Sequence, residues 1–288
     1  MISRDLVGVL YNSQRADAKN LAWKIVSDLN LGNDALVSGV EELEKIDAND
    51  WVGKVQLFIT VGGDGTILRA SHMAARNGVI ILGVNLGHLG FLTELRAEEA
   101  TEKIPEYLDG EAWIEERNMI EVRVLAKDLS SPQIAHEALN EVAIGRREVA
   151  GLSMIGVTVD GEPLTTYRAD AVIVSTATGS TGYALSAGGP ILHPQSQDIL
   201  ITPVAPHLDK SWALVLPKSA RVDVTFLSQQ AGALAIDGFI DIPIEYGDTV
   251  KIVNGESVAR FMRGNPPSHY YAELVRKLGL DPWETQLD

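Results

Sequence analysis

Residues 55–70 read VQLFITVGGDGTILRA, an apolar run followed by a glycine-rich turn and then by a helical pattern. The run Val55–Val61 predicts a buried strand, and Ile67-Leu68-Arg69-Ala70 predicts a helix. The glycines of Gly62-Gly63-Asp64-Gly65-Thr66 let backbone N–H groups approach an anion, and the start of the next helix directs its free N–H groups and positive dipole end to the same point. This strand, turn and helix predict an α/β layer with a phosphate site at the turn.

Asp64 is an unusual residue for such a turn, because a carboxylate repels phosphate. Its presence indicates a group that accepts a proton from an attacking hydroxyl, or one that holds a metal ion. The alternative is an ordinary strand-to-helix loop without a chemical role.

The rest of the first hundred residues alternates between strand-like and helix-like patterns. Strands are predicted at Leu6–Tyr11 and Val79–Val84, and a helix at Ala16–Leu29, beside the strand Val55–Val61 and a helix from Thr66. Such alternation is typical of a parallel α/β sheet, in which ligands bind beyond the carboxyl ends of the strands.

From about Trp113 the pattern changes to strands separated by turn signals, which predicts a mostly β second domain. The expected strands are Val122–Leu125, Glu141–Ile144, Ile155–Val159, Ala171–Ser175, Trp212–Leu216, Val222–Phe226, Ile242–Ile244 and Val250–Val253. A helix at Tyr270–Leu280 is expected to pack back onto the first domain.

Composition excludes several classes of function. The net charge of −15 opposes non-specific attraction to nucleic acid or to an anionic membrane, so neither is expected as a partner. The chain has no cysteine, which excludes disulfides and thiol catalysis. Its apolar runs are too short to span a bilayer and its first residues do not resemble a signal peptide, so we expect a cytoplasmic protein.

A second motif, Thr178–Pro190, follows the expected strand Ala171–Ser175 and reads TGSTGYALSAGGP. Its glycines and small hydroxyl residues cannot fill a core, so it predicts a binding loop. Hydroxyl and backbone N–H groups there can donate to phosphate or ribose, and the Tyr183 ring can lie against a purine or nicotinamide. The alternative is a glycine-rich turn that only redirects the chain.

These motifs, taken together, resemble those of the NAD kinases in the same order along nearly the whole chain. The matching stretches are Gly62–Thr66, Asn140-Glu141, Arg168-Ala169-Asp170, the Thr178–Pro190 loop, Ile201-Thr202-Pro203 with Pro206-His207, and Asp237-Gly238. The resemblance implies an N-terminal Rossmann-like α/β domain and a C-terminal β-sandwich-like domain, with the active site in the cleft between them. The α/β domain would comprise residues 1–110 and a C-terminal helix of about residues 266–288, and the β-rich dinucleotide-binding domain residues 111–265.

The resemblance also implies an activity, transfer of a phosphoryl group from ATP or another donor to the adenosine 2′-hydroxyl of NAD, giving NADP. Asp64 would be the catalytic base, Gly65 would present its backbone to phosphate, and Arg69 would offset the charge of the dinucleotide. Asn140 suits an adenine edge and Glu141 suits ribose hydroxyls.

The remaining dinucleotide contacts implied by the resemblance are Arg168, Asp170, Thr181, Gly182, Tyr183, Ala184, Leu185, Ser186 and Ala205. Arg168 and Asp170 are expected on one strand face. Arg146-Arg147 is either a phosphate-facing pair or a solvated turn, and Phe239 departs from the polar residue usual after Asp-Gly in the family.

The expected cofactor is a divalent cation, Mg²⁺, arriving mainly on the nucleotide. The histidines lack metal-ligand spacing, and we assign no residue to a metal. The resemblance implies a homodimer or homotetramer, with ATP or polyphosphate as donor. A lipid kinase sharing the first motif and a catalytically silent dinucleotide sensor are the competing interpretations; the acidic charge and the Asn140-Glu141 pair oppose the first, and the presence of Asp64 opposes the second.

Overall fold

The computed structural model describes residues 2–31, 35–43, 52–87, 90–127, 135–147, 151–207 and 211–279. The chain divides into two compact units. The first contains Met1–Ala70, Val79–Glu115 and Phe261–Asp288, and the second contains Ser71–Gly78 and Glu116–Arg260. Three elements contribute residues to both units: helix α4 (Asp64–Arg76) and strands β6 (Trp113–Leu125) and β17 (Thr249–Arg263).

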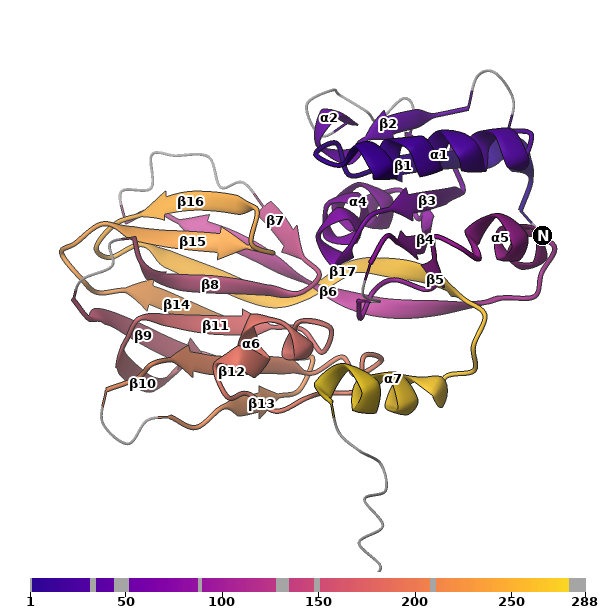
Figure 1. Ribbon diagram of the computed structural model, residues 1–288. Coiled ribbons are helices and arrows are strands. Elements are labelled where there is room, and N and C mark those ends of the chain that lie inside the picture. The colour runs from indigo at the N-terminus through magenta and orange to yellow at the C-terminus, as the bar shows by residue number, and fades with distance from the viewer. Residues whose placement is uncertain are drawn as a thin grey trace, which may run out of the picture. The chain divides into compact units, whose positions relative to one another are not determined.

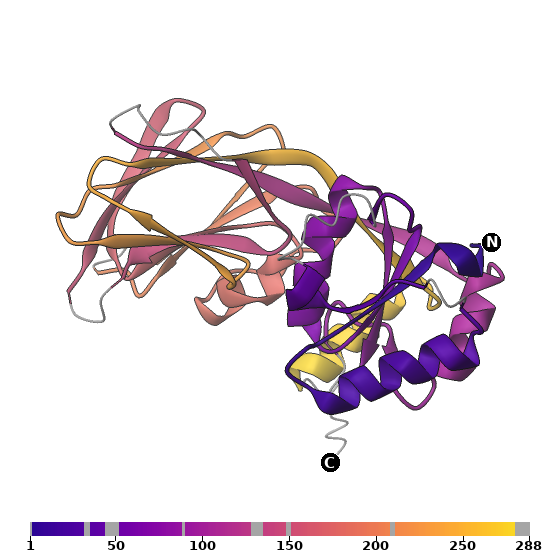
Figure 2. The same ribbon diagram turned by 90° about the horizontal axis from the view of Figure 1, so that it is seen from above.

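The first unit is built on parallel strands in the order β2-β1-β3-β4, with β5 paired to β4. Their bounds are β1 Val7–Tyr11, β2 Val37–Gly39, β3 Leu57–Val61, β4 Ile80–Asn85 and β5 Leu95–Arg96. Every residue of β1 and β3 is buried, as expected for parallel strands covered on both faces. Helices flank these strands in both views (Figures 1 and 2).

The helices of this unit pack through small and branched apolar residues. Helices α1 (Ala16–Asp28) and α5 (Ala100–Leu108) share one buried cluster with β1, β3 and β4. The unit also contains the short helices η1 (Arg4–Leu6) and α2 (Val40–Leu43), and the C-terminal helix α7 (His269–Leu278). Within the described parts of the chain, every helix is too short or too polar to cross a membrane.

The second unit has two antiparallel layers. One is a six-stranded sheet in the order β13-β12-β11-β8-β15-β16, and the other runs β10-β9-β14-β17, with β6 paired to β17 and β7. Their bounds are β7 Ala135–Ala138, β8 Glu141–Arg146, β9 Ser153–Val159, β10 Glu162–Ala169, β11 Ala171–Ser175, β12 Ile199–Val204, β13 Leu214–Leu216, β14 Val222–Phe226, β15 Gly232–Ile236 and β16 Ile240–Ile244. Inward-facing residues of both layers form one core, so the layers pack as a sandwich (Figure 1).

The predicted fold class, an N-terminal α/β domain followed by a mostly β domain, is confirmed. Helix α4 begins at Asp64, two residues before the predicted start at Thr66. Strands β10, β12 and β15 were not predicted, because Thr165-Thr166, Pro203 and Gly232 interrupt their apolar patterns. The predicted end of the C-terminal helix, Leu280, lies outside the described residues.

Candidate active site

Asp64 is the first residue of α4, directly beyond the carboxyl end of β3. Gly63 and Gly65 beside it have open space where a side chain would project. The start of α4 therefore lies beside accessible backbone, an arrangement that suits phosphate binding. Arg69 is half-buried on the same helix, close enough for its charge to act on Glu41.

A loop that follows β4 holds the Asp64 carboxylate. The backbone N–H of Phe91 donates to Oδ2 at 2.8 Å, and that of Leu92 donates to Oδ1 at 3.1 Å. A Cβ on Gly90 would lie 1.9 Å from Oδ1, so only glycine fits there. The loop therefore fixes the direction of the carboxylate.

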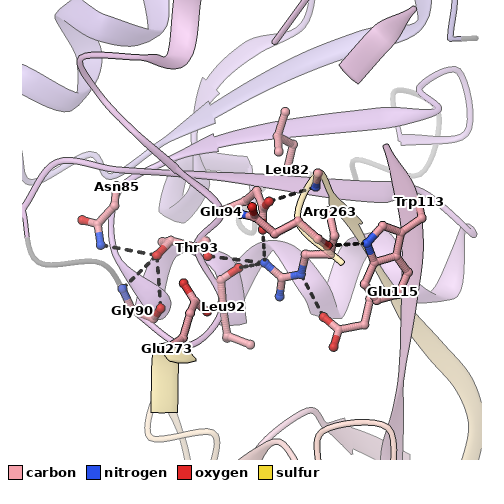
Figure 3. Close-up of polar contacts among 12 residues, drawn as sticks. Leu82, Asn85, Gly90, Leu92, Thr93, Glu94, Trp113, Glu115, Arg263 and Glu273 are labelled. Atoms are coloured by element: carbon pink, nitrogen blue, oxygen red, sulfur yellow. Dashed lines mark hydrogen bonds and ion pairs between the residues drawn. The ribbon is translucent and has the colours of Figure 1, made fainter. Parts of the chain in front are cut away.

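Residues 90–94 are themselves anchored by Arg263, at the end of β17. Its Nη1 donates to the carbonyl oxygens of Leu92 and Thr93 at 3.2 and 3.4 Å and lies 3.2 Å from Glu94 Oε2, while Nε donates to Glu115 at 2.8 Å (Figure 3). Burial alone would lower the pKa of Arg263, but Glu115 and Glu94 raise it, so the guanidinium stays charged. The sequence gives no signal for this cluster, because its members lie far apart along the chain.

In the second unit, Glu141 is the first residue of β8, at one end of the six-stranded sheet, and Asn140 directly precedes it. Glu141 is paired with Ser175 at the end of β11, and Ile236 at the end of β15 is paired with Val142. The glycine-rich loop that follows β11 therefore begins beside Asn140. A Cβ on Gly179 would lie 2.1 Å from the Asn140 carbonyl oxygen, so this close approach requires glycine.

The loop forms two short helices, η2 (Gly179–Thr181) and α6 (Tyr183–Ser186). Ala184 anchors it in an apolar cluster with Ile173 and Leu200, while the Tyr183 ring is 45% exposed. The predicted residues Thr181, Gly182, Tyr183, Ala184, Leu185 and Ser186 therefore lie together with Asn140 and Glu141. An exposed aromatic ring beside small hydroxyl residues suits a nucleoside.

Glu141 carries an unusual carboxylate. Burial and, to a smaller extent, the charge of Asp237 raise its pKa to about 7, although a hydrogen bond from the backbone of Tyr183 opposes the shift. Its Oε2 is buried and has no hydrogen-bond partner. An unpartnered buried acceptor is what a ribose hydroxyl would satisfy.

Asp237 organises the Asn140-Glu141 turn. Its fully buried carboxylate accepts hydrogen bonds from the backbone N–H groups of Leu139, Asn140 and Glu141 at 2.8, 2.8 and 3.0 Å. His72 Nε2 lies 2.7 Å from Oδ2, and the Phe239 ring packs edge-on against the His72 ring. Phe239, which departs from the family pattern, thus supports the histidine. His72 is a residue that the sequence alone did not single out. It lies eight residues after Asp64 on the same helix.

Arg168, Asp170 and Ala205 lie at the other end of β11. Arg168 and Asp170 were expected to share one strand face. Asp170 instead lies between β10 and β11, so it does not share a strand face with Arg168. Its carboxylate pairs with Arg146 at 2.7 Å, and Arg168 is exposed. Five residue steps separate Asp170 from Ser175, about 17 Å along a strand. The structure therefore brings the predicted residues of this unit into two groups rather than one.

Arg146 and Arg147 are not an equivalent pair. Arg146 is largely buried against Asp170, whereas Arg147 is exposed and lies 3.9 Å from Asp241. Among the described residues, no group of three or more histidine, cysteine or acidic side chains is arranged to hold a metal ion.

Two family models match this chain. The ATP-NAD kinase N-terminal domain matches residues 40–112, and the ATP-NAD kinase C-terminal domain matches residues 139–264. The chain belongs to the NAD kinase family. The competing interpretation of a lipid kinase is therefore set aside.

Relatives agree with this membership over almost their full lengths. The NAD kinase of Dehalococcoides mccartyi strain CBDB1 is 38% identical over 94% of this chain and 95% of its own. That of Aquifex aeolicus strain VF5 is 35% identical over 96% of this chain and 98% of its own.

Solved structures give the same fold. Yeast NADH kinase complexed with NADH superposes with a TM-score of 0.84 at 25% identity, covering 98% of this chain and 90% of that chain. A NAD kinase from Archaeoglobus fulgidus in complex with ATP gives 0.73 at 24% identity, covering 95% and 98%.

Proposed function

We propose that this protein transfers the terminal phosphoryl group of ATP to the adenosine 2′-hydroxyl of NAD, giving NADP and ADP, with Asp64 as the proton acceptor. The observation that carries the proposal is the position of Asp64. Asp64 is the first residue of a helix, and the glycines on either side of it have open space where a side chain would project. Its carboxylate is oriented by the backbone N–H groups of Phe91 and Leu92.

The chemistry needs one bond made and one broken. The 2′-oxygen attacks the terminal phosphorus, the bond from phosphorus to the bridging oxygen breaks, and the bridging oxygen leaves on ADP. The 2′-hydroxyl proton passes to Asp64. The first-turn N–H groups of α4 and the Gly65 backbone bind the phosphate oxygens, and Arg69 offsets their charge.

The acceptor is held by the second unit. Asn140 recognises an adenine edge, Glu141 accepts from ribose hydroxyls, and residues 181–186 contact the dinucleotide. The unpartnered Oε2 of Glu141 and the exposed Tyr183 ring support these roles. Arg168, Asp170 and Ala205, at the other end of β11, form a second group of dinucleotide contacts.

A divalent cation, Mg²⁺, accompanies the nucleotide when it is bound and neutralises phosphate charge. The described residues offer no cluster of ligands that would form a cage for it.

A homodimer or homotetramer and a cytoplasmic location stay predictions. The edge strand β13 supports self-association, because it carries an exposed apolar side chain, Val215, and Trp212 just before it is also exposed.

The activity is tested by incubating the protein with Mg²⁺, NAD or NADH, and either ATP or polyphosphate, and measuring NADP or NADPH. We expect NADP with at least one donor. 2′-Deoxy-NAD should compete with NAD and accept no phosphate, because the missing hydroxyl is the nucleophile. Phosphate transfer to 2′-deoxy-NAD at a rate near that of NAD would show that the acceptor atom is wrongly assigned.

A further inference from the structure

Lys277, in the last turn of α7, is a buried cation close to the proposed catalytic carboxylate. Its side chain is 9% exposed, whereas that of its neighbour Arg276 is 47% exposed. A lysine is rarely buried unless its charge is paired.

Three contacts account for this burial. The Lys277 ammonium donates to the carbonyl oxygen of Gly90, lies 4.1 Å from the centroid of the Phe91 ring, and lies 3.7 Å from Glu273 Oε2. A cation above an aromatic face and beside a carbonyl is held in both direction and distance. Two of the three contacts are made to the loop, not to α7 itself.

The same loop also holds the Asp64 carboxylate. Phe91 and Leu92 donate their backbone N–H groups to the Asp64 carboxylate, so Lys277 contacts the residues immediately around these donors. Thr93 steadies the turn, because its hydroxyl accepts from the N–H of Gly90 at 2.8 Å (Figure 3). Arg263 holds the next residues of the loop through the carbonyl oxygens of Leu92 and Thr93. Thr93 and Lys277 thus both hold Gly90, and Lys277 also contacts the Phe91 ring.

We propose that Lys277 is a positioning residue for phosphoryl transfer: by holding Gly90 and Phe91, it keeps the two N–H donors of Asp64 in place and so fixes the direction of the carboxylate. This inference rests on the proposed function. Misplacing a reacting group by about 1 Å can cost on the order of 100-fold in rate, so a residue that only orients Asp64 can matter for turnover.

The charge of Lys277 depends on the groups around it. Burial, with smaller contributions from the charges of Arg263 and Arg276, lowers its pKa to about 8, although the carboxylates of Glu273 and Asp64 oppose this shift. Below that pH the ammonium is charged and holds the loop. Above it, the neutral amine attracts the Gly90 carbonyl and the Phe91 ring less strongly, so turnover should fall as pH rises through about 8.

The test compares Lys277→Met, which keeps the apolar stem without the charge, with Lys277→Arg, which keeps the charge. Arg276→Gln is the matched control, one residue away and exposed. NADP formation is measured from pH 6 to 10 at saturating ATP. We expect kcat of Lys277→Met to fall by about 10–100-fold with the KM for NAD within about threefold of wild type. Lys277→Arg should recover most of the kcat that Lys277→Met loses, and the kcat of Arg276→Gln should be close to that of wild type.

The pH profile separates positioning from simple packing. The wild type should lose turnover above about pH 8, Lys277→Arg should lose it at higher pH, and Lys277→Met should show no such alkaline loss. Unchanged kcat in Lys277→Met, or an alkaline loss identical in all three proteins, would overturn the inference. The inference would also be overturned if Lys277→Met and Lys277→Arg lost kcat equally and both had a lowered melting temperature. If the wild type forms no NADP with either donor, the proposed function itself fails.

Discussion

The surroundings of the Glu141 side chain indicate what kind of ligand group it binds. Its carboxylate is mostly buried, one oxygen lacks a partner, and Asp237 lies nearby. Keeping such a group ionised costs free energy in the folded protein, and the raised pKa is the measure of that cost. Binding of a ribose hydroxyl would supply the missing partner.

Replacing Glu141 with Gln should therefore change how stability depends on pH. Because the folded-state pKa is raised to about 7, the proton that Glu141 binds stabilises the folded protein fully below the ordinary carboxyl pKa, and this contribution is lost as pH rises to about 7. We expect Glu141→Gln to be more stable than wild type at pH 8, by about 1–3 kcal/mol, and to lose that advantage near pH 4.5. Urea unfolding at both pH values measures the difference.

Glu162→Gln is the matched control, since Glu162 is exposed on β10. It should leave the pH dependence of the unfolding free energy unchanged. A Glu141→Gln profile parallel to that of wild type would show that the carboxylate is not perturbed in the folded protein.

Single residues were predicted best where their chemistry is local. Asp64 was placed correctly at a strand-to-helix turn because glycines, a carboxylate and an apolar run are all visible in five to ten neighbouring residues. His72, Arg263 and Lys277 were missed, because each acquires its contacts from partners remote in sequence: Asp237, Glu115 and Gly90. No periodicity or spacing signals such pairs.

At the scale of elements, the end of β15 supports the start of β8. Asp237 follows β15 with a left-handed φ of 48° and gives the turn at Leu139–Glu141 a partner for each N–H. The Asp237 carboxylate therefore holds the turn that we propose to bind the acceptor.

Asp237→Asn tests that dependence, because asparagine tolerates a left-handed φ but carries an NH₂ in place of one oxygen. We expect a loss of about 1–3 kcal/mol in unfolding free energy, since at least one buried N–H loses its acceptor, and a weaker affinity for NAD. Calorimetry and urea unfolding measure the two effects. Asp241→Asn, at an exposed position, should change neither by more than about 0.5 kcal/mol. Equal behaviour of the two variants would contradict the assignment.

The loop after β4 gives a second prediction at this scale. In Gly90→Ala the new Cβ would collide with the Asp64 carboxylate, so the carboxylate must turn and turnover should fall by about 100-fold. Gly87→Ala is the matched control, since a Cβ there meets nothing within 4 Å. NADP formation by the two folded variants gives the answer, and similar rates would show that the contact between Gly90 and Asp64 does not matter.

Whole elements were predicted where their apolar pattern is unbroken, as in β3 and β11. Strand β10 was missed because Thr165 and Thr166 break the alternation, and β12 because it contains Pro203. Pairing with neighbouring strands overrides these local preferences, and a single sequence does not display that pairing.

At the scale of the whole molecule, the change from alternating strands and helices to successive strands was enough to predict an α/β unit and a β unit. What it could not predict is that the residues expected to contact the dinucleotide lie at the two ends of β11. That division follows from the antiparallel register, which sets Glu141 opposite Ser175 and Gly145 opposite Ala171.

The proposed reaction depends most directly on Asp64, which accepts the proton of the attacking hydroxyl. Asp64→Asn keeps the shape of the side chain and removes the proton acceptor, and Asp109→Asn, exposed at the end of α5, is its control. The measurement is kcat for NADP formation together with NAD affinity by calorimetry. We expect kcat to fall by about 10²–10⁴-fold in Asp64→Asn with NAD affinity largely kept, and no change in the control. Turnover near that of wild type in Asp64→Asn would contradict this assignment.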